Sequence, residues 1–221
     1  MKTVIYIRSI SDDVPEYMVS NDTFDSVERI QRMLWRYAYS KDYQSQMLYM
    51  KNGELNGIIS CIFITDMPFE YLQNESRTHK VTVKSAWKDN IRYTSFVKVS
   101  VIPYDANIKA NRDDFKVTKL SGYGTYGYSA TVIRHQPSVK IDCKLGTFWP
   151  FKKKDKDDLI KVLSMLMSNK SKQLEDRRYV LDPYFMIKDS NVEITDEQNV
   201  MSVLDGNLDL LYKGCVKNGF E

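Results

Sequence analysis

Polar side chains, many of them basic, recur at alternate positions in the middle of the chain. Lys80 and Lys84 alternate with apolar residues in one predicted strand, and Arg92, Phe96 and Lys98 share one face of the next. Because successive side chains of a strand point to opposite faces of a sheet, this pattern predicts one apolar face and one polar, basic face. A basic face can follow a phosphate backbone, since each lysine or arginine that contacts a phosphate releases bound counterions.

The small net charge of the whole chain does not reveal how strongly basic this middle segment is. The chain has 221 residues and a formal net charge of +3. Residues 77–154 carry +11, whereas residues 1–76 and 155–221 each carry −4. A basic segment between acidic flanks indicates a polyanionic partner, unless the segments neutralise one another in the folded protein. An anionic membrane surface would suit the same charges.

Aromatic side chains lie among these charges and in the glycine-rich segment that follows them. Single-stranded nucleic acids are often held by cations that contact phosphates and by aromatic rings that stack on bases. The sequence therefore predicts a non-enzymatic protein that binds nucleic acid, single-stranded by preference. The residues predicted to bind it are Lys80, Lys84, Arg92, Phe96, Lys98, Tyr123, Tyr126, Lys140 and Lys144.

Residues 122–127 contain the spacing G-x-G-x-x-G. A dinucleotide site needs a helix directly after the last glycine, with its N-terminus at the pyrophosphate. Residues 128–134 alternate as a strand instead, so we expect a hairpin loop and no bound cofactor.

Two alternatives stay open. Asp142 and Lys144 match the D-x-K half of a metal-dependent nuclease pattern, with Asp105 as the second carboxylate on a hard cation. The other alternative is a viral or bacteriophage structural protein that acts through protein–protein assembly, as a homo-oligomer or with a protein partner. Its support is compositional, a bias towards Asn, Lys, Ile and Tyr.

The cysteines and histidines exclude several kinds of site. Cys61, Cys143 and Cys215 are separated by 82 and 72 residues, which is neither zinc-ligand nor redox spacing. The two histidines exclude a three-histidine metal site. We therefore expect no metal and reduced thiols in a cytoplasmic protein. No apolar run is long enough to span a membrane, and the N-terminus lacks the apolar core of a secretory signal.

Hydrophobic periodicity predicts the elements that position these side chains. Apolar steps of three and four from Thr23 predict an amphipathic helix of about 17 residues. Acidic residues before Leu159 predict a second helix, and the capping-box pattern Thr195 to Gln198 predicts a third, weakened by Gly206. Strands are expected near 3–8, 47–50, 58–65, 184–187 and 192–194, and an antiparallel sheet is expected from 78–86, 91–102, 114–120, 128–134 and 138–145.

These elements predict an α+β fold. We expect a mainly antiparallel sheet of five to seven strands with N- and C-terminal helices packed on one face. The chain 1–221 is predicted to form a single domain. The nearest candidate boundary is 146–154, between a β-rich basic core and a helical acidic C-terminal part.

Overall fold

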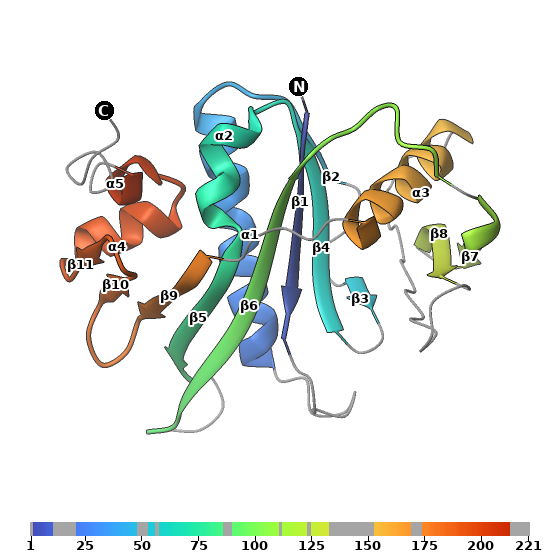
Figure 1. Ribbon diagram of the computed structural model, residues 1–221. Coiled ribbons are helices and arrows are strands. Elements are labelled where there is room, and N and C mark those ends of the chain that lie inside the picture. The colour runs from blue at the N-terminus through green and yellow to red at the C-terminus, as the bar shows by residue number, and fades with distance from the viewer. Residues whose placement is uncertain are drawn as a thin grey trace.

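The computed structural model has one large mixed sheet with helices against both faces (Figure 1). The residues that the structure describes are 2–10, 21–47, 53–55, 58–85, 90–110, 112–122, 125–132, 153–168 and 174–212. Within them, nine strands form the main sheet, with β3 (Gly53–Leu55) beside β4. The order of the other eight is β11 (Glu193–Ile194), β10 (Met186–Lys188), β9 (Leu174–Val180), β5 (Arg77–Lys84), β6 (Arg92–Pro103), β1 (Thr3–Ser9), β4 (Ile58–Thr65) and β2 (Ser45–Met47).

The predicted α+β fold with a mainly antiparallel sheet is confirmed, and the sheet is larger than the five to seven strands expected. β1 lies in its middle and pairs antiparallel with β4 and β6, so that Thr3 lies opposite both Thr65 and Pro103. Ile5 and Val4 belong to the two different hydrophobic clusters, one on each side of the sheet. This explains why β1 is apolar at successive positions, as a strand covered on both faces must be.

Helices cover both faces of the sheet, which differs from the prediction of helices on one face. α1 (Asn21–Ser40), α4 (Glu197–Leu204) and α5 (Asp209–Tyr212) pack on one side, where Met33, Leu34 and Val203 are buried. α3 (Lys153–Ser168) packs on the other side through Ile160 and Leu163. The second face needs a cover because β1, β4 and β6 all bury apolar side chains there.

Local sequence signals explain where several helices begin. Asp196 caps α4, and its side chain accepts a hydrogen bond from the backbone N–H of Asn199. Pro68 immediately precedes α2 (Phe69–Leu72), which continues into the 3₁₀ helix η2 (Gln73–Glu75). No helix in the described part of the chain is both long and apolar enough to cross a bilayer.

The basic middle segment is divided between two sheets, which corrects the prediction of one antiparallel sheet over 77–145. β5 and β6 belong to the main sheet, whereas β7 (Phe115–Gly122) and β8 (Thr125–Val132), which follow the 3₁₀ helix η3 (Arg112–Asp114), form a separate hairpin. The predicted strand 138–145 lies outside the described residues. β9 was not predicted, because its seven residues LEDRRYV are mostly charged and bury few side chains.

Candidate functional site

Five of the nine residues predicted to bind nucleic acid lie together on β5 and β6. In the antiparallel register of these strands, Lys80 lies opposite Phe96, Lys84 opposite Arg92, and Lys98 opposite Thr78. We call this set the polar sheet face: Lys80, Lys84, Arg92, Phe96 and Lys98. The Nζ atom of Lys80 lies 5.7 Å from the centroid of the Phe96 ring, within the range of a cation–π interaction.

The polar sheet face is less basic than the sequence predicts, because β9 and the residues after it supply acids. Asp176 Oδ2 lies 2.7 Å from Lys80 Nζ, and Asp182 Oδ2 accepts a hydrogen bond of 2.7 Å from Arg92 Nε. This face therefore carries two acidic side chains that come from outside the basic middle segment. Ion pairs this exposed stabilise a fold by about 1 kcal/mol or less, but they offset the positive charges of Lys80 and Arg92.

The other predicted site residues are not part of this face in the described structure. Tyr126 lies in β8, on the separate hairpin, where it pairs with Ser121. Tyr123, Lys140 and Lys144 lie outside the described residues, and so does Asp142. The expected hairpin around 122–127 is present, since Gly122 pairs with Thr125.

The described residues do not form the metal site of a nuclease. Asp105 is exposed, and its carboxylate accepts a hydrogen bond from the backbone N–H of Asn107 at 2.8 Å. In the described segments, no cluster of three or more histidine, cysteine or acidic residues could hold a metal ion. Cys61 is a free thiol inside the core, where burial raises its pKa to about 12 and keeps it unreactive. Cys143 and Cys215 lie outside the described residues.

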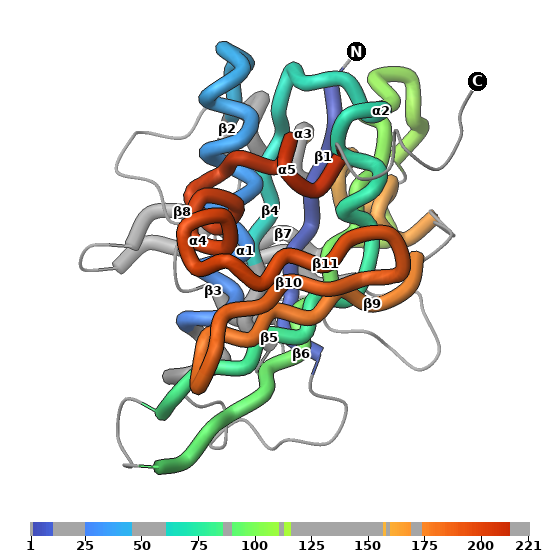
Figure 2. Tube along the Cα trace, turned by 90° about the vertical axis from the view of Figure 1, so that its left-hand side faces the viewer, coloured from blue at the N-terminus to red at the C-terminus, as the bar shows by residue number. Residues whose placement is uncertain are grey.

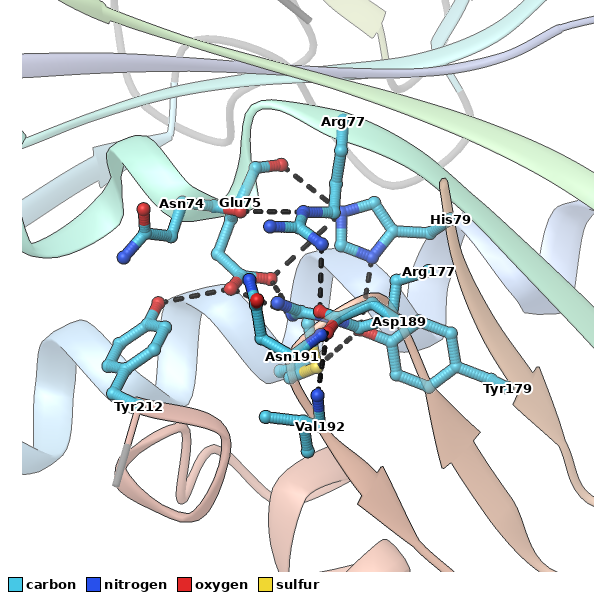
Figure 3. A network of polar contacts seen from close by, with 11 residues as sticks. Asn74, Glu75, Arg77, His79, Arg177, Tyr179, Asp189, Asn191, Val192 and Tyr212 are labelled. Atoms are coloured by element: carbon cyan, nitrogen blue, oxygen red, sulfur yellow. Dashed lines mark hydrogen bonds and ion pairs between the residues drawn. The ribbon is translucent and has the colours of Figure 1, made fainter. Parts of the chain in front are cut away.

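A second polar cluster, which the sequence analysis did not predict, lies inside the protein (Figure 3). We call it the buried ion network: Glu75, Arg77, His79, Arg177, Tyr179, Asp189 and Tyr212. Arg177 is its centre, because its Nη1 atom donates to both carboxylate oxygens of Glu75 at 2.8 and 2.7 Å, while its Nε donates to Asp189 at 2.8 Å. Figure 3 shows the guanidinium of Arg177 between these two acids.

Further members of the network donate hydrogen bonds to the two carboxylates. Arg77 Nη1 donates to Asp189 Oδ2 at 2.8 Å, and the Tyr212 hydroxyl donates to Glu75 Oε1 at 3.1 Å. The other oxygen of Asp189 accepts hydrogen bonds from the backbone N–H groups of Asn191 and Val192. The positive charges of two arginines thus balance the negative charges of two carboxylates. Such pairing with hydrogen bonds offsets the free-energy cost of removing charged groups from water.

His79 is the neutral member of the network, and its contacts indicate its tautomer. Its Nε2 atom lies 3.2 Å from the carbonyl oxygen of Glu75, which can only accept, so Nε2 carries the proton. Nδ1 then accepts a hydrogen bond of 3.0 Å from the Tyr179 hydroxyl. Burial, together with the neighbouring Arg177, lowers the pKa of His79 from 6.5 to about 4, against the opposing effect of Glu75.

The two carboxylates stay ionised in the interior. Burial raises the pKa of Glu75, but the charge of Arg177, the hydrogen bonds from Arg177 and the charge of Arg77 outweigh this and leave it below its usual value. Burial also raises the pKa of Asp189, and Arg177 with the N–H of Asn191 outweighs it in the same way. Most side chains of the buried ion network are buried, so we interpret it as a feature that stabilises the fold rather than as a substrate site.

The network joins parts of the chain that are distant in sequence. Glu75, Arg77 and His79 come from η2 and β5, whereas Arg177, Tyr179 and Asp189 come from β9 and the segment after β10. In the sequence, His79 alternates with Val81 and Val83, which puts it on the apolar face of its strand. This alternation was a signal that a polar group is buried here. Figure 2 shows β9, β10 and β11 crossing in front of β5. Because β9 is the neighbour of β5 in the main sheet, the network fastens the C-terminal strands β9 and β10 to β5.

The lowered pKa of His79 predicts a loss of stability in mild acid. Below pH 6.5 the unfolded chain takes up a proton on this residue, whereas the folded protein does so only near pH 4. Stability contributed by neutral His79 is thus complete above pH 6.5 and falls by about 2 kcal/mol at pH 5. Urea unfolding at pH 7 and pH 5 measures this, and His79→Gln should flatten the difference. An equal pH dependence in both proteins would contradict the assignment.

The chain resembles bacterial release factors in sequence. No protein-family model matches it. It is 29% identical over 227 residues to peptide chain release factor 2 of Haemophilus ducreyi, with 88% of this chain and 61% of that protein covered. Peptide chain release factor 2 of Thermosipho africanus is 28% identical, with 84% of this chain and 58% of that protein covered. The chain thus spans about three fifths of the length of these relatives.

The fold agrees with this likeness. RF2 of Thermus thermophilus superposes with a TM-score of 0.69 at 19% identity, over 100% of this chain and 69% of that protein. These relatives overturn the prediction of a free nucleic-acid-binding protein with a preference for single strands. They also overturn both alternatives, the viral or bacteriophage assembly protein and the nuclease, because the proteins that this chain resembles are peptide chain release factors.

Proposed function

We propose that this chain acts in the termination of translation, at the place on the ribosome that a release factor occupies. The observation that carries the proposal is the likeness to peptide chain release factor 2 over 84–88% of the chain, with a matching fold along all of it. Translation takes place in the cytoplasm of bacteria, so this role would also place the chain there.

The shape of the sheet suggests which part reaches the ribosome. The paired ends of β5 and β6 project beyond the other strands at one end of the sheet (Figures 1 and 2). Lys84 and Arg92 are exposed there and lie opposite each other, and Ile91 beside them is 40% exposed. A projecting, cationic and partly apolar strand end is a suitable contact for a large, negatively charged assembly.

The buried ion network supports this role indirectly. It fastens β9 beside β5 in parallel, with Tyr179 opposite Val81. β5 is therefore held by β6 on one side and by β9 on the other, which limits how far the projecting strand end can move. A contact held in place before binding loses less conformational entropy when it binds.

Co-sedimentation with ribosomes stalled at a stop codon tests the proposal. We expect the chain to pellet with them, and Lys84→Glu to weaken this association about fivefold or more, since it reverses a charge at the proposed contact. Lys109→Glu is the matched control, because Lys109 is an exposed lysine beyond the opposite end of β6. Failure of the unaltered chain to pellet would reject the proposal, and equal effects of the two variants would reject the contact surface.

A further inference from the structure

A pocket lies where α1 ends and the chain turns into β2. It has a volume of about 660 Å³ and is lined by Trp35, Tyr39, Asp42, Tyr43, Gln44 and Ser45. This volume falls within the range of small-molecule and side-chain binding sites. Trp35 is anchored by an edge-to-face contact with Phe63, at 5.5 Å between ring centroids, so this wall of the pocket rests on the core of the sheet.

Two polar side chains that line this pocket, those of Asp42 and Ser45, form no hydrogen bond or ion pair with other described residues. The hydroxyl of Ser45 is buried and has no hydrogen-bond partner among the residues that the structure describes. Within the described segments, the carboxylate of Asp42 forms neither an ion pair nor a hydrogen bond. The neighbouring Lys41 does not neutralise it, because its Nζ atom is 2.8 Å from Asp209 and 5.7 Å from the ring of Tyr37. A buried hydroxyl left unpaired costs stability, so a ligand that pairs with it would gain affinity.

Asp42 lines the pocket from the turn between α1 and β2. Asp42 has φ 60°, in the left-handed region, where the backbone N–H donates to the carbonyl oxygen of Tyr39. Aspartate, asparagine and glycine tolerate this conformation better than other residues. The turn therefore fixes an acid beside the aromatic side chains of Tyr39 and Tyr43, and Tyr39 is 76% exposed and open to a ligand.

We propose that this pocket binds a guanidinium group. Its carboxylate supplies the negative charge, and its three aromatic rings supply faces on which a planar cation stacks. The unpaired Ser45 hydroxyl can accept one of the five N–H donors of a guanidinium. The group could be carried by a small molecule or by an arginine side chain of a protein, and both share the chemistry that the pocket recognises.

Titration followed by the tryptophan side-chain N–H signals in NMR spectra tests this site on the full chain. The protein has three tryptophans, and Trp35→Phe identifies the signal of Trp35. Agmatine presents the guanidinium on a small molecule, and N-acetyl-arginine methylamide presents it as in a protein. We expect the Trp35 signal to shift with a dissociation constant on the order of 1 mM for at least one of them, and the tighter probe indicates the natural source.

Matched controls distinguish recognition of the cation from non-specific binding. N-acetyl-citrulline methylamide has the same shape without the charge and should bind at least fivefold more weakly. Asp42→Asn keeps a residue suited to the positive φ and should weaken binding at least fivefold. Asp25→Asn makes the same change near the other end of α1, about 25 Å away, and should have no effect.

Two results would overturn the assignment: no shift of the Trp35 signal with either probe, or equal binding of the arginine and citrulline compounds. The titration uses no ribosomes, so its outcome is independent of the role proposed in translation.

Discussion

Replacing Glu75 by glutamine is expected to lower the free energy of unfolding by about 3–5 kcal/mol. Glu75 is fully buried, and its carboxylate accepts two hydrogen bonds from Arg177 and one from Tyr212. Glutamine has nearly the same shape but no charge, so within the described structure the guanidinium of Arg177 would keep Asp189 alone as an ion-pair partner. Urea unfolding followed by circular dichroism measures the loss.

The matched control for this variant is Glu193→Gln. Glu193 also forms an ion pair with a basic residue, at 2.6 Å from Lys188, but both side chains are about half exposed. Solvent screens such a pair, so the loss should be below about 1 kcal/mol. A loss at Glu75 no larger than at Glu193 would show that the buried ion network does not hold β9 and β10 in place beside β5.

Gly206→Ala is expected to destabilise the fold by about 3 kcal/mol. Gly206 has φ 103°, which L side chains rarely adopt. A Cβ atom there would lie 2.7 Å from the Cβ of Arg36 and 2.8 Å from the backbone nitrogen of Tyr37, and the backbone of α1 cannot move away cheaply. Thermal or urea unfolding measures the effect.

Gln198→Ala is the control for this substitution, because Gln198 is exposed in α4 and its replacement should change stability by less than about 0.5 kcal/mol. If Gly206→Ala were equally mild, the close approach of α4 to α1 at this position would be wrong.

The same glycine shows what periodicity can and cannot predict. The sequence placed Gly206 inside a helix and expected it to weaken that helix. In the structure it ends α4 instead, since its N–H donates to Val203 and the N–H of Asn207 donates to Ser202, the two bonds of a Schellman motif. The apolar spacing identified the helix correctly, but the end depended on how closely α1 approaches, which is a tertiary contact.

Strands with regular alternation were predictable, and the polar strand was not. β5 and β6 alternate between buried and exposed side chains along most of their length, so their faces follow from period two. β9 buries only Arg177 and Tyr179 well, and an arginine gives no hydrophobic signal. Because β9 supplies the centre of the buried ion network and one acid of the polar sheet face, neither feature could be derived from periodicity.

The error about function has the same origin. Counting charges along the chain suggested a basic face for nucleic acid, but the count ignored that Asp176 and Asp182 would lie beside Lys80 and Arg92. Charge composition indicates the kind of surface a protein has and does not identify its partner. The proposed role in termination rests instead on the likeness to peptide chain release factor 2, which extends over most of the chain and agrees with the fold.

Competition for the ribosome is the most direct test of the proposed function. Labelled release factor 2 is bound to ribosomes stalled at a stop codon, and the unlabelled chain is added in increasing amounts. If the chain occupies the place of a release factor, it displaces the label completely and in a saturable manner. If the label stays bound at chain concentrations far above those that saturate ribosomes in co-sedimentation, the chain binds elsewhere and the proposal is wrong.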